Sequence, residues 1–382
     1  MPFLIQKLSQ LLEIRKQNLL FRQPRLAAGT IDFCSNDYLG LARSIQLWQA
    51  SHYLSNQITP RNGSTGSRLL TGHSQLYEEL EKELATFYQG EAALLFNSGY
   101  DANLGLCSCL LQKGDTWLYD ELCHASIRDG LRLSVAKHWS FRHNDLEDLE
   151  DKLQRAQGNK VVIVEAIYSM DGDKAPLLEI IELCKRYYAD LVIDEAHATG
   201  IRGKHGNGLT NELNVAECCL ARIYTFGKAL GVHGAVVVGS KILKEYLCNF
   251  ARSLIYTTSL PPHSLCAIRA AHQLLPTLET VRNQLSNIIA YFKKQIEAFS
   301  FLPFEFQIEE GPIAILYVPG NEKATKLALY LQKNFIDARA ILSPTVPAGK
   351  ERIRFCLHAY NTPIEIDLLF SLLKEQVGVI FD

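Results

Sequence analysis

Two apolar runs, VVIV at residues 161–164 and LVI at residues 191–193, flank a stretch with helical periodicity at residues 177–188. Runs that are apolar throughout, rather than alternating, are typical of strands covered by helices on both faces. Two such strands joined by a helix form a βαβ unit, whose strands lie parallel. The chain is therefore predicted to build an α/β fold on a mostly parallel sheet, with functional residues at the strands' carboxyl ends.

Length and charge restrict the domain count and the class of partner. The chain of 382 residues suits one large α/β domain with a smaller companion. Its formal net charge of -2, from 39 basic and 41 acidic residues, provides no field for a polyanion, so nucleic acid is not an expected partner. No stretch approaches the roughly 18 consecutive apolar residues that span a bilayer, so no membrane association is expected.

Cysteine usage bears on metals and on the compartment. The ten cysteines include no CxxC pair, and the closest pairs, Cys107 with Cys109 and Cys218 with Cys219, lack the usual spacing of zinc ligands. Core packing is favoured, and no metal is expected. Residues 1–7 also lack a charged segment leading into a long apolar one. Reduced thiols in the cytoplasm are the expectation.

A lysine stands in a turn interrupted by glycines, at residues 225–231 (TFGKALG), between two short apolar runs. Glycine permits a close approach of backbone and ligand, and partial desolvation lowers the pKa of a lysine well below its usual range. A lysine such as Lys228 can then bond covalently to a carbonyl compound. The same sequence pattern is also compatible with an ordinary solvated lysine in a loop, and the segment alone leaves both interpretations open.

A strand candidate at residues 92–96 is followed by a glycine turn and a helical run. Backbone N–H groups at a helix N-terminus point outward, and the helix dipole favours negative charge there. A phosphate would therefore sit well against Ser98, Gly99 and Tyr100. Many strand-to-helix connections contain such a turn without binding an anion. This motif alone therefore does not distinguish a phosphate site from an ordinary connection.

Polar groups stand at or just beyond the ends of the predicted strands: Ser169, Asp194, His197, Thr225 and Lys228. Asp194 closes an apolar strand, where an unpaired carboxylate is costly, so a cation or donor is expected beside it. A protonated pyridine nitrogen satisfies that requirement. His197 would then donate to a ring oxygen, although a histidine bonded to backbone at a helix start is an equal alternative.

A smaller α+β region is predicted after a pair of prolines at residues 261–262. The expected division is an N-terminal helix and arm at residues 1–40, a large domain at 41–255 and a small domain at 256–382. Arg354 lies within an apolar strand of that small domain, where a guanidinium is unexpected unless it meets a carboxylate. A substrate carboxylate and an ordinary ion pair remain equal alternatives for it.

Taken in order, the motifs of this chain resemble those of the pyridoxal-phosphate-dependent α-oxoamine synthases, over nearly the whole chain. The motifs are residues 35–40 (SNDYLG), 98–103 (SGYDAN), 124–126 (HAS), 169–173 (SMDGD), 194–197 (DEAH), 225–228 (TFGK) and 344–347 (PTVP). The resemblance implies an aminotransferase-like fold of fold type I and pyridoxal 5'-phosphate (PLP) as the cofactor. It also implies a homodimer with shared active sites.

The resemblance assigns roles by motif. Lys228 would hold the cofactor covalently, Asp194 would bond the pyridine nitrogen, His197 would bond the ring oxygen, and His124 would stack on the ring face. These four are the expected catalytic residues. Further cofactor contacts are implied for Ser98, Gly99, Tyr100, Ser169, Thr225 and, across a subunit interface, Thr258. Substrate contacts are implied for Arg22, His124, Thr345 and Arg354.

The implied reaction is the decarboxylative condensation of L-alanine with a pimeloyl thioester, on carrier protein or coenzyme A, in biotin biosynthesis. Sister synthases that use glycine, such as 2-amino-3-ketobutyrate ligase and 5-aminolevulinate synthase, are the nearest alternatives. A binding protein that kept the fold without catalysis is a further one. Three positions depart from the family pattern, His233, Tyr77 and Asn361, and each is expected to affect the fit of the acyl substrate.

Overall fold

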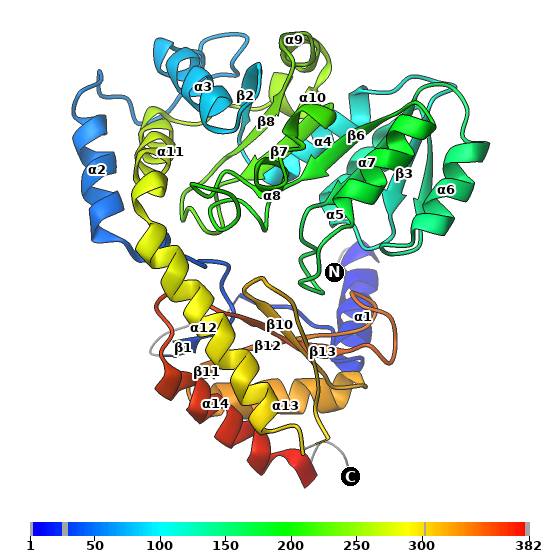
Figure 1. Ribbon diagram of the computed structural model, residues 1–382, viewed down its shortest axis with the longest axis vertical. Helices are drawn as coiled ribbons and strands as arrows, with labels where there is room; N and C mark the ends of the chain where they lie inside the picture. The colour runs from blue at the N-terminus through cyan, green and yellow to red at the C-terminus, as the bar shows by residue number, and fades with distance from the viewer. Residues whose placement is uncertain (1–2, 25–29, 302, 379–382) are drawn as a thin grey trace. The chain divides into compact units, whose positions relative to one another are not determined.

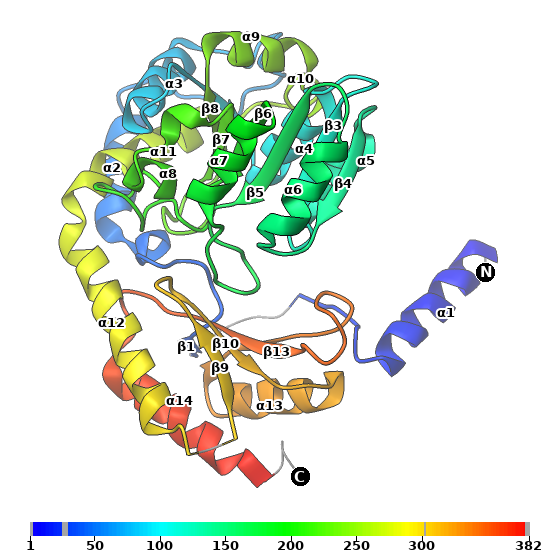
Figure 2. The same cartoon turned by 45° about the vertical axis from the view of Figure 1, so that its right-hand side comes forward.

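The computed structural model describes residues 3–24, 30–301 and 303–378, and the chain divides into two compact units (Figure 1, Figure 2). The large unit comprises residues 36–169 and 173–283, and the small unit comprises residues 1–35, 170–172 and 284–382. Among the described residues, no helix has both the length and the apolar character that crossing a bilayer requires.

The large unit is built on a seven-stranded sheet within the described part of the chain. In sheet order the strands are β2 (Ala92–Phe96), β8 (Ala235–Gly239), β7 (Ala221–Thr225), β6 (Ala189–Asp194), β5 (Lys160–Glu165), β3 (Thr116–Asp120) and β4 (Lys137–Phe141). β8 runs antiparallel to both of its neighbours, and all the other pairs are parallel. The mostly parallel sheet predicted from the apolar runs is confirmed.

Both faces of this sheet are covered, which explains why its central strands are apolar throughout. Val161 and Ile163 of β5 pack into one buried cluster, and Val162 and Val164 pack into another on the opposite face. The first cluster includes side chains of α4 (Gly99–Cys109), α5 (Ala125–Leu133), α9 (Lys241–Phe250) and α10 (Arg252–Ile255). The second includes side chains of α6 (Leu146–Arg155), α7 (Leu177–Arg186) and α8 (Leu209–Glu212).

The remaining helices of the large unit complete its packing. They are η1 (Leu41–Arg43), α2 (Ile45–Ser55), α3 (Gln75–Phe87), η2 (Ala216–Cys218), α11 (Pro262–Leu274) and η3 (Leu275–Thr277). α11 packs against α2 and α3, with Leu265 and Ile268 fully buried. These helices belong to the same unit as the sheet.

The small unit has the α+β character expected for it. Its four-stranded antiparallel sheet has the order β12 (Arg339–Ile341), β13 (Arg352–Cys356), β10 (Ile313–Tyr317) and β9 (Glu305–Ile308). Two further strands, β1 (Ile31–Asp32) and β11 (Ile336–Asp337), pair in parallel. The helices are α1 (Phe3–Gln17), α13 (Asn321–Lys333) and α14 (Pro363–Glu375), and α12 (Glu279–Ala298) continues into this unit from the large one.

The units differ from the expected division at residues 170–172, which belong to the small unit, and at two other places. Pro262 occupies the first turn of α11, where proline is tolerated because that N–H has no partner within a helix. The proline pair thus begins a helix of the large unit and does not end that domain. At the other end of the chain, Ile31 pairs with Ile336, so β1 belongs to the small unit.

Candidate active site

A cavity of about 260 Å³ lies in the large unit, where β5, β6 and β7 end. Its wall also includes the first turn of α4 and the turn that follows β7. The cavity brings together most of the predicted cofactor contacts: Ser98, Gly99, Tyr100, His124, Asp194, Thr225 and Lys228. These predicted residues therefore lie together near the carboxyl ends of the parallel strands, as expected.

Asp194 is the last residue of β6 and is only 4% exposed. Its Oδ1 accepts a hydrogen bond from the Ala196 amide at 2.9 Å, and its Oδ2 accepts one from Asn103 Nδ2 at 2.7 Å. Both donors are neutral groups. A cation beside a buried carboxylate stabilises its negative charge more than neutral donors do. The arrangement therefore fits a protonated ring nitrogen.

The N-terminus of α4 forms a second polar feature of the cavity. Ser98 caps the helix, and its Oγ accepts from the Asp101 amide at 3.1 Å, while the first amides of a helix lack acceptors within it. Opposite stands Thr225, whose buried Oγ1 has no hydrogen-bond partner among the described residues. A Cβ on Gly99 would lie 2.3 Å from Thr225 Cγ2, so only glycine fits. These donors suit a phosphate group.

Lys228 lies half-buried in the turn after β7. The turn is closed by hydrogen bonds from the Gly231 amide to the Lys228 carbonyl at 2.9 Å and from the Val232 amide to the Phe226 carbonyl at 3.0 Å. Gly231 has a φ of 64°, and a Cβ there would lie 2.1 Å from the Ala42 amide nitrogen. The backbone that carries Lys228 is therefore fixed in place.

His124 caps α5 and reaches Asp194 through a chain of polar groups. Its Nδ1 accepts from the Ser126 amide at 3.2 Å and lies 2.8 Å from Ser126 Oγ. Ser126 Oγ in turn accepts from Asn103 Nδ2 at 3.1 Å, and the same Nδ2 donates to Asp194. Partial desolvation in the cavity wall lowers the pKa of His124, with Asp194 opposing the shift and Lys228 adding to it. The imidazole is therefore neutral at neutral pH.

Three other predicted cofactor contacts belong to the large unit but do not line this cavity. His197 is buried, and its Nδ1 lies 2.8 Å from Tyr38 Oη, which donates to Asn36 Oδ1 at 3.1 Å. Ser169 is also buried. Thr258 is exposed, and its carbonyl accepts from the side chain of Asn97 at 2.8 Å.

The predicted substrate residues other than His124 belong to the small unit. Arg22 Nη2 donates to Thr345 Oγ1 at 3.5 Å, and both residues line a cavity of about 600 Å³ whose wall is largely apolar. Arg354 lies in β13, is 9% exposed and places Nη1 3.0 Å from Cys356 Sγ. It does not line that cavity. The structure thus groups Arg22 with Thr345, and Arg354 pairs in β-sheet register with Arg339, which lines the same cavity.

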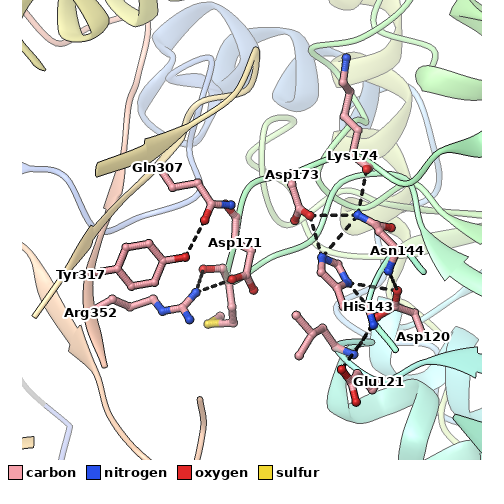
Figure 3. Close-up of polar contacts among 12 residues, drawn as sticks. Asp120, Glu121, His143, Asn144, Asp171, Asp173, Lys174, Gln307, Tyr317 and Arg352 are labelled. Carbon is pink, nitrogen blue, oxygen red and sulfur yellow. Dashed lines mark hydrogen bonds and ion pairs between the residues drawn. The ribbon is translucent and has the colours of Figure 1, made fainter. Parts of the chain in front are cut away.

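The motif at residues 169–173 is held by ion pairs (Figure 3). Within the small unit, Asp171 pairs with Arg352, whose side chain is 4% exposed. Within the large unit, His143 lies between Asp173, at 2.6 Å, and Asp120, at 2.9 Å. Burial opposes the charge on His143, but the hydrogen bonds to the two carboxylates outweigh it and raise its pKa to about 10. His143 is therefore charged at neutral pH.

Sequence reasoning assigned no role to Asn103, Ser126 or Glu165, all of which line the large-unit cavity. Asn103 and Ser126 stand inside two of the recognised motifs, but their function as a link between His124 and Asp194 requires contacts between separate helices. Glu165 carried a usable signal, because it ends β5 as Asp194 ends β6. A carboxylate at the end of an apolar strand needs a cation or donor beside it, and this holds for Glu165 as it does for Asp194.

The three departures from the family pattern lie in different surroundings. His233 lines the large-unit cavity. Tyr77 is 2% exposed and donates to the Leu260 carbonyl at 3.3 Å, and burial raises its pKa to about 12. Asn361 is buried and accepts from the His358 amide at 2.9 Å. Tyr77 and Asn361 therefore support the packing of their units, and His233 alone is placed to contact a ligand in this cavity.

Residues 28–371 match the family described as aminotransferase class I and II. An 8-amino-7-oxononanoate synthase of Emericella nidulans is 40% identical over 366 residues, which cover 91% of this chain and 89% of that protein. The crystal structure of 8-amino-7-oxononanoate synthase from Francisella tularensis is 30% identical, with a TM-score of 0.79, covering 92% of this chain and 99% of that one. A serine palmitoyltransferase from S. paucimobilis with bound PLP is 28% identical, with a TM-score of 0.89, covering 99% of this chain and 100% of that one.

Proposed function

Because this chain belongs to the class I and II aminotransferase family and its relatives include 8-amino-7-oxononanoate synthases, we propose that it catalyses the reaction named for them. That reaction condenses L-alanine with a pimeloyl thioester and releases carbon dioxide and a thiol. The predicted fold and the PLP cofactor are confirmed by the family and its PLP-containing structures. One observation carries the proposal: Asp194, Lys228 and His124 line one cavity with an unpartnered threonine hydroxyl.

The residues of this cavity fit PLP at both of its polar ends. Thr225 Oγ1 and the first amides of α4 would hold the phosphate, and the carboxylate of Asp194 would keep the ring nitrogen protonated. Bound PLP supplies an electron-withdrawing ring that takes up the electron pair left when a bond to the amino acid's α-carbon breaks. His124 would cover the ring face as a neutral imidazole. Ser169 and His197 are proposed as further contacts.

Lys228 has two tasks in this proposal. Its Nζ would hold the cofactor in the resting enzyme, and the same amine, once free, would take the α-proton of alanine as a general base. The fixed turn around Gly231 keeps the amine in reach throughout. The α-carbon would then bond to the thioester carbonyl carbon as the C–S bond breaks and releases the thiolate. The carboxyl group of alanine would leave as carbon dioxide, and the α-carbon would take up a proton in its place.

The arginines of the small unit are proposed to bind the substrates. Arg354 is assigned to the alanine carboxylate, because a guanidinium pairs with a carboxylate through two parallel hydrogen bonds. Arg22 and Thr345 are assigned to the thioester substrate, on either carrier protein or coenzyme A. The wall of the 600 Å³ cavity that these two line includes apolar side chains, such as Phe21, Leu329 and Ile341, that would suit an acyl chain.

We further propose a homodimer in a reducing compartment such as the cytoplasm. Thr258 is exposed, as a residue must be if it reaches the phosphate site of a second subunit. All ten cysteines are free thiols, which suits a reducing environment. Sedimentation velocity on the holoenzyme tests the dimer directly, and a monomeric active enzyme would contradict it.

A substrate panel tests the function. Purified holoenzyme is given alanine, glycine or serine in all combinations with acetyl, succinyl, pimeloyl and palmitoyl thioesters, and thiol and carbon dioxide release are measured together. We expect the highest kcat/KM for alanine with the pimeloyl thioester. Preference for glycine with a short acyl group would identify a sister synthase, and cofactor binding without turnover of any pair would identify a binding protein.

A further inference from the structure

Glu165 and Asp194 are neighbours across two parallel strands. They occupy paired register positions at the ends of β5 and β6, and both line the proposed cofactor cavity. They are 2% and 4% exposed. Since side chains at paired positions project from the same face of a sheet, two carboxyl groups share one poorly solvated wall. The reaction proposed above uses only one of them.

The hydrogen bonds to these two groups are unequal. Asp194 accepts at both oxygens, from Ala196 and Asn103. Glu165 accepts at Oε1 from the His124 amide at 2.6 Å, and its Oε2 accepts no hydrogen bond from the residues that the structure describes. Hydrogen bonds to a carboxylate stabilise its charged form. The surroundings therefore favour ionised Asp194 over ionised Glu165.

The burial of Glu165 and the charges that face it also favour its protonated form. The pKa of Glu165 is raised to about 8: burial is the largest cause, the charge of Asp194 adds to it, Lys228 and the hydrogen bond from the His124 amide oppose it, and Asp120 adds a smaller increase. Two neighbouring groups, Cys123 and Tyr168, have their own pKa values raised, chiefly by burial, and so stay neutral. Ionising both carboxyl groups in one desolvated site costs more free energy than ionising one of them.

We propose that Glu165 is a positioning residue that works in its protonated form, within the function proposed above. Its Oε1 holds the backbone of His124, and through it the imidazole on the cavity wall. Its proton leaves Asp194 as the only negative side chain among the residues that line the cavity. Loss of that proton places a second negative charge beside the cofactor ring and so changes the charge balance that Asp194 sets.

Difference infrared spectroscopy tests the protonation state without turnover. Wild-type holoenzyme is compared with Glu165→Gln, which keeps an acceptor for the His124 amide but cannot ionise. At neutral pH we expect the wild type to show a carboxylic acid C=O band that the variant lacks, and this band should convert to a carboxylate band as the pH rises. If the wild type already shows the Glu165 carboxylate band at neutral pH, the proposal is overturned.

The positioning role needs a second pair of measurements. Absorbance of the bound cofactor is titrated from about pH 6 to about pH 10, and the wild type is expected to show an ionisation that Glu165→Gln lacks. Glu165→Ala, which also removes the acceptor for His124, is expected to lower kcat at least about tenfold below that of Glu165→Gln. Equal kcat for the two variants, or an unchanged titration in Glu165→Gln, contradicts the proposal.

The outcomes separate this inference from the proposed function. The infrared band and the absorbance titration are read in the absence of both substrates, so they do not depend on which amino acid or thioester the enzyme uses. Glu147→Gln, on the exposed side of α6, is the matched control and should reproduce the wild-type band and titration. A failed substrate panel with an intact Glu165 band would reject the reaction and keep the protonated state of Glu165.

Discussion

Asn103 Nδ2 donates to Asp194 Oδ2 at 2.7 Å, from the second turn of α4 to the end of β6. Asn103 is 2% exposed, and the same nitrogen donates to Ser126 Oγ at 3.1 Å. One amide group therefore links the carboxylate proposed to hold the pyridine nitrogen with the hydroxyl that holds His124. A single side chain therefore positions two groups that are proposed to contact the cofactor ring.

Replacing Asn103 by alanine should weaken PLP binding. A hydrogen bond to a charged group contributes about 1.5 to 3 kcal/mol, so the PLP concentration that half-saturates the apoenzyme should rise roughly 10-fold to 150-fold. Cofactor absorbance during titration of the apoenzyme gives this value. Asn249→Ala, at an exposed position of α9, should leave it unchanged. Equal PLP affinity in both variants would show that Asp194 needs no support from Asn103.

Lys228→Ala should abolish turnover while the protein stays folded, because truncating a half-buried turn residue removes little packing. Lys228→Arg should fail as well, since a guanidinium does not deprotonate near neutral pH. Product formation and circular dichroism check the two parts. Lys241→Ala is the control, because that side chain is 72% exposed. Substantial turnover in Lys228→Ala would remove Lys228 from the mechanism.

Asp194→Asn should slow the loss of the alanine α-proton strongly, because a neutral amide does not stabilise a protonated ring nitrogen. Exchange of the α-proton with deuterium from solvent, followed by NMR, reports this step without the thioester. Asp151→Asn, whose partner is Arg155 on the same helix, serves as a surface control. An exchange rate equal to that of the wild type would reject the assigned role of Asp194.

Arg354→Ala should raise the dissociation constant of alanine at least about tenfold, which corresponds to roughly 1.4 kcal/mol. Removing one partner of a charge pair shielded from water costs on the order of 2 to 5 kcal/mol, whereas an exposed pair contributes about 0 to 1. Arg354→Lys should also weaken alanine binding, because lysine lacks the planar two-pronged contact. The absorbance change of the cofactor on adding alanine measures the affinity.

A matched control for this experiment is Arg155→Ala, since that side chain is 70% exposed. If the alanine affinity of Arg354→Ala stays within about twofold of the wild type, Arg354 is a structural arginine. The carboxylate contact would then be sought first at Arg22, which lies beside Thr345 in the small-unit cavity. The same titration on Arg22→Ala decides between the two arginines.

His143 should stabilise the large unit in a pH-dependent way. Its pKa is raised from 6.5 to about 10 in the folded protein by Asp120 and Asp173 against the effect of burial. A raised pKa contributes stability that is complete below the unfolded value and disappears as the pH rises through the folded value. His143→Gln should therefore lower the free energy of unfolding most below pH 6.5, and the difference should shrink towards pH 10.

Urea unfolding of wild type and variant at several pH values measures this dependence. His138→Gln is the control, because His138 lies at an exposed position of β4. The denaturant midpoint of the control should follow that of the wild type at every pH. A loss of stability in His143→Gln that is constant with pH would show that His143 contributes through packing and not through its charge.

The sequence by itself determined the parallel sheet and the places of the main polar groups. Residues 161–164 are all apolar because helices cover both faces of β5, and the amino-acid sequence alone shows this pattern. Asp194, Thr225 and Lys228 follow directly after apolar runs, so the rule that parallel strands share one functional edge was enough to bring them together. The local sequence pattern was sufficient to predict the position of a residue wherever that position depends only on the direction and order of the strands.

Tertiary structure decided whatever depends on partners that are distant in sequence. Asn103 meets Asp194 across 91 residues, and the protonation of Glu165 depends on a carboxylate that only strand pairing places beside it. The proline pair at the start of α11 predicted a domain boundary by local rules, yet packing against α2 and α3 keeps that helix in the large unit. A sequence pattern specifies the environment that a residue needs, but hydrogen bonds, burial and charge are energies between pairs of groups, and only the folded chain brings those pairs together.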